Sequence, residues 1–186
     1  MSLIRSKKEK EYPWYMRMLF YLQKKKFGIV LKPALIWGRA PHIYAGFLLM
    51  FHRLNRKKSP IDPQLNALVT IRTSQLNDCP FCIDMNAQRL IEKGGSFEKV
   101  DELSSYATSS LFSEKEKAAL EYTDAMTLNK ATSEELFSQL KCHFSDDALV
   151  ELTALIAFQN MSSKFNAALK IPSQGLCKIT VPKEEA

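Results

Sequence analysis

Hydrophobic positions recur at helical spacing along most of this chain, so nearly every segment predicts a helix. Leu65, Leu68, Val69 and Leu76, for example, fall at the spacing of one buried helix face. The chain has few glycines, no alternating strand runs, and neither an Asn-Gly nor an Asp-Gly hairpin turn. The pattern therefore predicts an all-α fold.

Capping residues and prolines set the expected helix boundaries. Pro41 precedes an apolar helix from about His42 to Leu54, and Asp62 with Pro63 begins the next helix, which runs to about residue 77. Cys79 and Pro80 begin a helix that ends at Gly94-Gly95, and a short helix follows from about Phe97 to Tyr106. Capping boxes at Ser113 with Glu116 and at Thr132 with Glu135 open the next two helices. A last long helix begins at Ser145 and is ended by Pro172 and Gly175.

The length of 186 residues is most simply one domain. We expect a basic, aromatic arm over residues 1–40, a helical domain over 41–175 and a tail over 176–186.

Much of the net charge of +6 lies in the first sixty residues, in three clusters interleaved with aromatics: Lys7, Lys8, Lys10, Lys24, Lys25, Lys26, Arg56, Lys57 and Lys58. Such a pattern fits a nucleic-acid or membrane surface. Because no recognised nucleic-acid motif accompanies it, an arm that packs on the domain or on a sister subunit is favoured, with no nucleic-acid partner.

The sequence also bears on location. The longest apolar stretches, such as residues 43–51, are too short to span a bilayer, so we expect no membrane span. The N-terminus turns charged at once and shows no signal peptide. We expect a cytoplasmic location, where a closely spaced cysteine pair favours catalysis or metal binding over a structural disulfide.

Cys79 and Cys82 are the strongest candidates for chemistry. Their spacing places both thiols at the start of a helix, within reach of a disulfide, where the positive end of the helix dipole favours a thiolate. A zinc site would need further ligands, but Cys142 and Cys177 stand alone and the three histidines are scattered, so we expect no metal. A purely structural pair is the remaining alternative.

Other chemistry-bearing residues have simpler explanations. Cys142 and His143 are neighbours on a helix, about 100° apart, and are poorly placed to act together. His52 lies on an apolar helix and fits a packing or interface role, and Cys177 is expected to be exposed. The remaining acidic and phenolic candidates, Glu121, Tyr122 and Asp124, fit a half-exposed helix face.

The run from Arg72 to Asn86 resembles the carboxymuconolactone decarboxylase/alkyl hydroperoxidase D (AhpD) family. The shared elements are an Arg-x-Ser-Gln-x-Asn approach beginning at Arg72, the Cys79–Cys82 motif, and the acidic Asp84 two positions later. Residues 149–172 look like the family's last helix, and the resemblance covers roughly residues 40–172.

This resemblance implies an AhpD-like, oligomer-forming helical fold, as a trimer, dimer or hexamer. It also implies a peroxidase or disulfide reductase in which Cys82 attacks the substrate and Cys79 resolves the product. The partners would then be a peroxide or disulfide substrate and an external thiol reductant, with no metal or organic cofactor.

The chain departs from the family at its proton relay. AhpD members carry a glutamate twelve residues before the first cysteine and a histidine four after the second, where this chain has Ala67 and Asn86. A carboxamide takes no proton at neutral pH, and losing a positioned base slows a reaction by about 10²–10⁴-fold. We therefore expect weak peroxidase turnover, unless Asp84 or a sister-subunit group supplies a base.

Two alternatives stay open. One is the decarboxylase branch of the family, which acts on a lactone acid and generally lacks the cysteine pair, so Cys79 and Cys82 argue against it. The other is a non-catalytic oligomeric protein that senses redox state or binds a ligand, which the missing relay makes credible.

Overall fold

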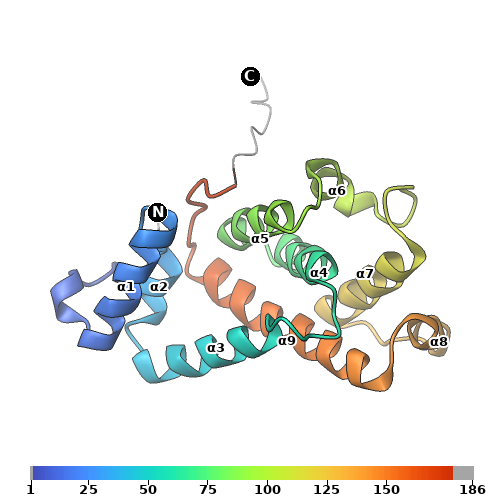
Figure 1. Ribbon diagram of the computed structural model, residues 1–186, viewed down its shortest axis with the longest axis horizontal. Helices are drawn as coiled ribbons and strands as arrows, with labels where there is room; N and C mark the ends of the chain where they lie inside the picture. Colours follow the sequence, from blue (N-terminus) through green and yellow to red (C-terminus); the bar gives the residue numbers. More distant parts are fainter. Residues whose placement is uncertain (1, 178–186) are drawn as a thin grey trace, which may run out of the picture.

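The computed structural model describes residues 2–177, and within this range every regular element is a helix. The α-helices are α1 (Trp14–Phe27), α2 (Lys32–Trp37), α3 (Pro41–Leu54), α4 (Pro63–Leu76), α5 (Pro80–Glu92), α6 (Phe97–Asp101), α7 (Glu114–Thr127), α8 (Glu134–His143) and α9 (Asp146–Ala168), with 3₁₀ turns at Glu9–Glu11 and Glu102–Ser105. The all-α prediction is confirmed for these residues (Figure 1). Of the expected tail, residues 178–186 lie outside the described part.

Helix α4 is the centre of the packing, lying against α5, α7 and α9. It is buried on all sides, so it carries polar side chains inside the core as well as apolar ones. The hydroxyls of Thr70, Thr73 and Ser74 donate to carbonyls one turn earlier in the same helix. These bonds satisfy the buried hydroxyl groups without leaving the helix.

The N-terminal arm folds onto the domain instead of standing apart from it. Tyr12, Met16 and Phe20 bury their side chains in one cluster with Trp37 of α2 and Tyr44 of α3. Figure 1 shows α1 and α2 together at one end of the molecule, beside α3 and the C-terminal end of α9. The arm thereby closes one side of the space in front of α5.

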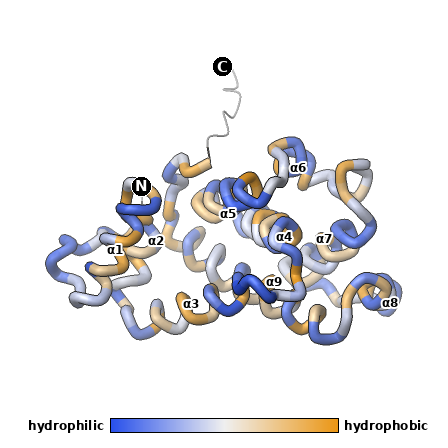
Figure 2. The backbone as a smooth tube through the Cα atoms, in the orientation of Figure 1, coloured by the Kyte–Doolittle hydropathy of each residue, from blue (hydrophilic) through white to orange (hydrophobic). Residues whose placement is uncertain are grey.

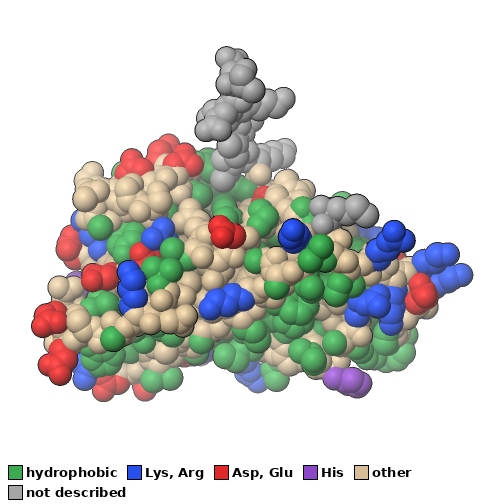
Figure 3. All heavy atoms as spheres, turned by 180° about the vertical axis from the view of Figure 1, so that it is seen from behind, with side chains coloured by type: hydrophobic (Ala, Val, Ile, Leu, Met, Phe, Trp, Pro, Cys, Tyr) green, Lys and Arg blue, Asp and Glu red, His purple; other side chains and the backbone are tan. Residues whose placement is uncertain are grey.

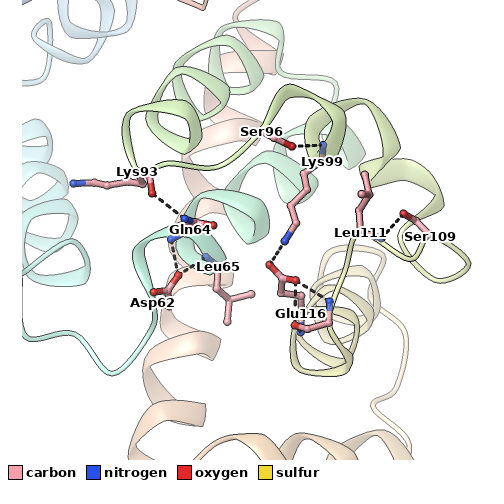
Figure 4. A network of polar contacts seen from close by, with 10 residues as sticks. Asp62, Gln64, Leu65, Lys93, Ser96, Lys99, Ser109, Leu111 and Glu116 are labelled. Atoms are coloured by element: carbon pink, nitrogen blue, oxygen red, sulfur yellow. Dashed lines mark hydrogen bonds and ion pairs between the residues drawn. The ribbon is translucent and has the colours of Figure 1, made fainter.

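Capping follows the sequence signals at most helix starts. Asp62 accepts hydrogen bonds from the amides of Gln64 (2.8 Å) and Leu65 (3.3 Å), and Gln64 in turn donates to the carbonyl of Lys93 at the end of α5 (Figure 4). Ser113 forms the expected capping box with Glu116.

The capping box predicted at Thr132 and Glu135 is wrong. The hydroxyl of Ser133 caps α8 instead, accepting from the amide of Leu136 (3.1 Å). The helix therefore begins at Glu134. Threonine and serine are both good caps, and the sequence alone does not decide between neighbours.

Helix α3 is apolar but largely uncovered. Only Tyr44 and Leu54 are buried in it, whereas Ile43 and Leu49 are 64% and 60% exposed. Figure 2 shows orange and pale shades along α3, and hydrophobic side chains gather over this end of the molecule in Figure 3. Between residues 2 and 177, no helix combines the length and apolar character needed to cross a membrane.

Candidate functional site

The turn between α4 and α5 carries the two cysteines. Asp78 adopts a left-handed backbone conformation, with φ of 49°, and the amide of Cys79 donates to the carbonyl of Ser74 (3.0 Å). Cys79 is then the N-cap of α5 and Pro80 its first residue. Proline suits this position because it has no N–H to leave unpaired. The expected helix start is confirmed, with Cys82 in the first turn.

The structure joins Cys79 and Cys82 in a disulfide, with their Cα atoms 5.3 Å apart. The Sγ of Cys79 accepts a hydrogen bond from the amide of Cys82 (3.3 Å). The Sγ of Cys82 accepts one from the carboxamide nitrogen of Asn166, which comes from α9 (3.3 Å). Hydrogen bonds to a sulfur favour its charged form, so both donors would also stabilise a thiolate after reduction.

Arg72 is part of the framework and does not serve the thiols. Its guanidinium donates twice to the Asp124 carboxylate on α7 (2.6 and 2.8 Å), and Tyr106 donates to the same carboxylate (3.2 Å). The hydrogen bond with Asp124 raises the pKa of Arg72, while burial and then the charge of Asp124 raise that of Tyr106. Asp124 is therefore committed to this structural pair.

Three further hydrogen bonds attach the cysteine turn to α9. The Asn77 carboxamide donates to the side chains of Asn160 and Ser163, both at 2.9 Å. Ser74 accepts from the carboxamide of Gln159 (2.8 Å). The residues that carry the family resemblance thus fix the orientation of the turn.

The two relay positions hold no base. Asn86 donates to the carbonyl of Cys82 (2.9 Å) and accepts from the guanidinium of Arg89 (3.1 Å), which also donates to Asn55. Ala67 is buried in an apolar cluster. At the positions where the resemblance to AhpD members implies a histidine and a glutamate, this chain therefore has hydrogen-bonded amide and guanidinium groups and a methyl group. None of these groups takes up a proton near pH 7.

Asp84 anchors the segment that follows α9. Its carboxylate accepts from the hydroxyl of Ser173 (2.7 Å) and from the amides of Gln174 (3.1 Å), Leu176 (3.0 Å) and Cys177 (2.7 Å). Burial raises the pKa of Asp84, but these hydrogen bonds outweigh it and hold that pKa below its usual value. A carboxylate so fully engaged is a poor general base, so the structure gives no support to the base role considered for Asp84.

Replacing Asp84 by asparagine should lower the free energy of unfolding by about 1–3 kcal/mol near neutral pH, because an NH₂ group would then face a buried amide donor. The depressed pKa means that the native carboxylate stabilises the fold above its unfolded pKa of about 3.9 and loses this effect as the pH falls. The difference between wild type and Asp84→Asn should therefore shrink in acid. Urea unfolding followed by circular dichroism measures both, with Asp101→Asn, on an exposed residue, as the control. Equal stabilities at neutral pH would refute the anchoring role.

A cavity of about 610 Å³ lies in front of α5, between the N-terminal arm, α3 and α9. Its walls are mainly apolar, and they include the aromatic side chains of Trp37, Tyr44, Phe47, Phe51, Phe81 and Phe158. Cys82 lines this cavity together with Asn86, Arg89 and Asn166, whereas Cys79 does not line it and is fully buried. A molecule in the cavity would therefore contact Cys82 and not Cys79.

The other sequence candidates lie away from the cysteine pair. Cys142, His143 and His52 are exposed, and Cys142 donates to the carbonyl of Ser138 (3.4 Å). Tyr122 is buried and its hydroxyl bonds that of Thr153 (2.9 Å), and Glu121 is exposed on the same helix. The expectation that Cys177 is exposed is wrong, because the Asp84 anchor holds its backbone in a buried position.

Sequence reasoning missed Asn166 and Arg89. Asn166 lies 84 residues beyond Cys82, and only the packing of α9 against α5 brings its side chain to the sulfur. Arg89 could have been found, since residues 82, 86 and 89 repeat on one helix face. Over residues 2–177, the structure contains no cluster of three or more His, Cys, Asp or Glu side chains suited to a metal ion.

The chain is similar to known proteins in sequence and in fold. The carboxymuconolactone decarboxylase family model matches residues 41–125. The uncharacterized protein YnjA of Escherichia coli (strain K12) is 40% identical over 168 residues, which cover 90% of this chain and 92% of YnjA.

Two solved structures share the fold. An AhpD-core, peroxidase-related protein of Ralstonia eutropha JMP134 superposes with a TM-score of 0.84 over 94% of both chains, at 17% identity. The debrominase Bmp8 superposes with a TM-score of 0.80 over 95% of this chain and 94% of its own, at 21% identity. The AhpD-like fold is thus established, and with the family model and the relative YnjA it shows that the chain belongs to the carboxymuconolactone decarboxylase family.

Proposed function

We propose that this protein is a thiol-dependent oxidoreductase in which Cys79 and Cys82 cycle between dithiol and disulfide, with a hydroperoxide or a disulfide as the substrate. The observation that carries the proposal is the position of the pair. Cys82 lines an aromatic cavity, and its disulfide partner lies buried beside it at the N-cap of α5.

The chemistry needs two thiols and an external reductant. In the peroxidase form, the Cys82 thiolate attacks the distal peroxide oxygen, the O–O bond breaks, and an alcohol leaves as Cys82 becomes a sulfenic acid. The Cys79 sulfur then displaces hydroxide, which leaves as water, and forms the disulfide. An external dithiol returns two electrons and two protons by thiol–disulfide exchange. A cytoplasmic location would supply such thiols.

The order of the cysteines follows from access and not from electrostatics. Cys79 is the N-cap of α5, and its sulfur accepts a hydrogen bond from the amide of Cys82. The helix end therefore favours the thiolate of Cys79 at least as much as the thiolate of Cys82. A substrate in the cavity, however, meets only Cys82. We therefore assign the attack to Cys82, with Asn166 stabilising its thiolate, and the resolving step to Cys79.

Turnover should be slow. A helix terminus contributes about 0.3–2 kcal/mol, or at most about 1.5 pKa units, which leaves a thiol of ordinary pKa near 8.5 only partly ionised at neutral pH. Asn86 and Arg89 cannot remove the proton. The same thiol pair could also reduce other acceptors, and a cysteine-to-alanine variant of Bmp8 has been solved with 2,3,4-tribromopyrrole. The aromatic walls make a halogenated pyrrole worth including among the substrates tested.

The proposal is tested by the mass of the reduced protein before and after addition of cumene hydroperoxide, with free thiols blocked under non-reducing conditions. We expect the loss of two thiol hydrogens and a Cys79–Cys82 link. A protein that stays reduced with cumene hydroperoxide and with a small disulfide would instead fit the non-catalytic alternative, in which the pair senses redox state or the cavity only binds a ligand.

We also propose that the protein forms a homo-oligomer. Helices α1 and α3 contribute buried side chains to one apolar cluster, and both also expose large apolar side chains, among them Trp14 (74% exposed) and Tyr21 (66% exposed) on α1. An exposed apolar patch marks an interface in many proteins. Light scattering coupled to size-exclusion chromatography measures the mass in solution, and a monomer at micromolar concentration would contradict the proposal.

A further inference from the structure

Three buried polar atoms around the cavity have no partner. Among the described residues, four buried side-chain nitrogen or oxygen atoms lack a hydrogen bond, and three of them belong to cavity-lining residues: Trp37 Nε1, Asn66 Oδ1 and Asn166 Oδ1. These side chains are 5%, 4% and 2% exposed. Native proteins rarely leave such atoms unpaired, and an explanation is expected for each one. The one donor among them, Trp37 Nε1, would bond an acceptor such as a carboxylate oxygen, whereas the two asparagine oxygens need a donor, such as a water molecule or a ligand hydroxyl.

The cavity also carries a positive charge that no carboxylate neutralises directly. Arg89 donates to the neutral amides of Asn86 and Asn55 and lies over the Phe51 ring, 5.4 Å from its centroid. Burial lowers the pKa of Arg89, and the charge of Glu92 opposes this effect. The charged residues that line the cavity are Lys26, Arg56, Lys57, Arg89 and Lys93, all basic, and the acidic Glu92; Arg56 is paired with Glu151. The net positive charge of these lining residues favours an anionic ligand.

The shape of the apolar wall selects a flat ligand. The Trp37 ring stacks with those of Phe165 (3.7 Å between centroids) and Phe47 (5.1 Å), and Phe47 continues to Phe158 (4.8 Å). Aromatic side chains in such an arrangement offer π faces and edges to another ring. A cavity of about 610 Å³ is large enough for a compact ring system with polar substituents.

From these observations we infer that the cavity binds a flat, largely apolar organic anion, such as an arene carboxylate, with its acidic group at Arg89 and its ring against the aromatic wall beside Cys82. That this anion is the substrate, carrying the reducible group, rests on the proposed thiol chemistry. The inference that the anion binds in the cavity does not depend on that chemistry.

The test uses the full chain with Cys79 and Cys82 both replaced by serine, so that no thiol reaction can occur at the site. A Trp14→Phe change leaves Trp37 as the sole tryptophan and makes its fluorescence a reporter of the cavity. The probes are 2-naphthoate and its neutral counterpart 2-naphthylmethanol, with isothermal titration calorimetry as the second readout. We expect the carboxylate to bind at least about 10-fold more tightly than the alcohol, since hydrogen bonds to a charged group are the strong ones.

Arg89→Gln removes the charge and keeps hydrogen-bonding capacity. It should lower the affinity for 2-naphthoate by about 10-fold or more and change the affinity for 2-naphthylmethanol by no more than about twofold. Arg17→Gln also removes one positive charge, but from an exposed residue outside the cavity, and should change neither affinity. Equal affinities of the two probes for the test protein that retains Arg89 would overturn the inference, as would the absence of binding by both probes. This holds even if Arg89→Gln fails to fold. Charge-dependent binding in a protein that never oxidises its thiols would leave the ligand site standing and remove the proposed function.

Discussion

Hydroperoxide turnover should fall by at least about 10³-fold, to the background rate, when Cys82 is replaced by serine. Cys82 is the one cysteine of the pair that lines the cavity, and a serine hydroxyl is far less nucleophilic than a thiolate. Cys79→Ser should also stop steady-state turnover, but for another reason. It should still consume about one equivalent of hydroperoxide per chain, because attack occurs and only the resolving step is lost.

Cys142→Ser is the matched control for these two variants. Cys142 is an exposed thiol that does not line the cavity, so its loss should leave the rate unchanged. Turnover is measured by disappearance of cumene hydroperoxide with dithiothreitol as reductant. If Cys79→Ser lost the single-equivalent reaction and Cys82→Ser kept it, the assigned order of the two cysteines would be reversed.

Asn86→His should raise the rate of hydroperoxide reduction, by about 10²-fold if the ring reaches the geometry of a positioned base. Residue 86 lies one turn beyond Cys82 on the same face of α5 and lines the cavity. The neighbouring Arg89 charge would lower the pKa of the new imidazole and so keep it neutral and able to accept a proton near pH 7.

Asn86→Gln is the control, since it keeps a carboxamide and supplies no base. The gain in Asn86→His should also appear as the pH rises through the imidazole pKa and be absent in acid, where the ring is already protonated. A rate equal to that of Asn86→Gln across this range would show that the missing relay does not limit turnover.

The helical fold and the cysteine turn were accessible from sequence because their determinants are local. Apolar spacing, Asp62 with Pro63, and Cys79 with Pro80 act over one or two helical turns, and the structure bears them out. The error at Thr132 is local too, since Thr132 and Ser133 are adjacent and both are common N-cap residues.

The surroundings of the thiols were not accessible because they are assembled from distant segments. Asn166 reaches Cys82 only through the packing of α9, and Trp37 enters the cavity wall only because the N-terminal arm folds back. Asp84 shows the limit most clearly. Its position two residues after Cys82 suggested a base, but its partners come from residues 173–177, which the local pattern does not place beside it.

Trapping the oxidised cysteine directly tests the central assignment, that Cys82 is the sulfur that meets the substrate. Reduced Cys79→Ser protein is treated with one equivalent of cumene hydroperoxide in the presence of dimedone, and the labelled peptide is identified by mass spectrometry. A dimedone adduct on Cys82 is the predicted result. An unlabelled Cys82 in a protein that has consumed the hydroperoxide, or an adduct confined to Cys142, would contradict it.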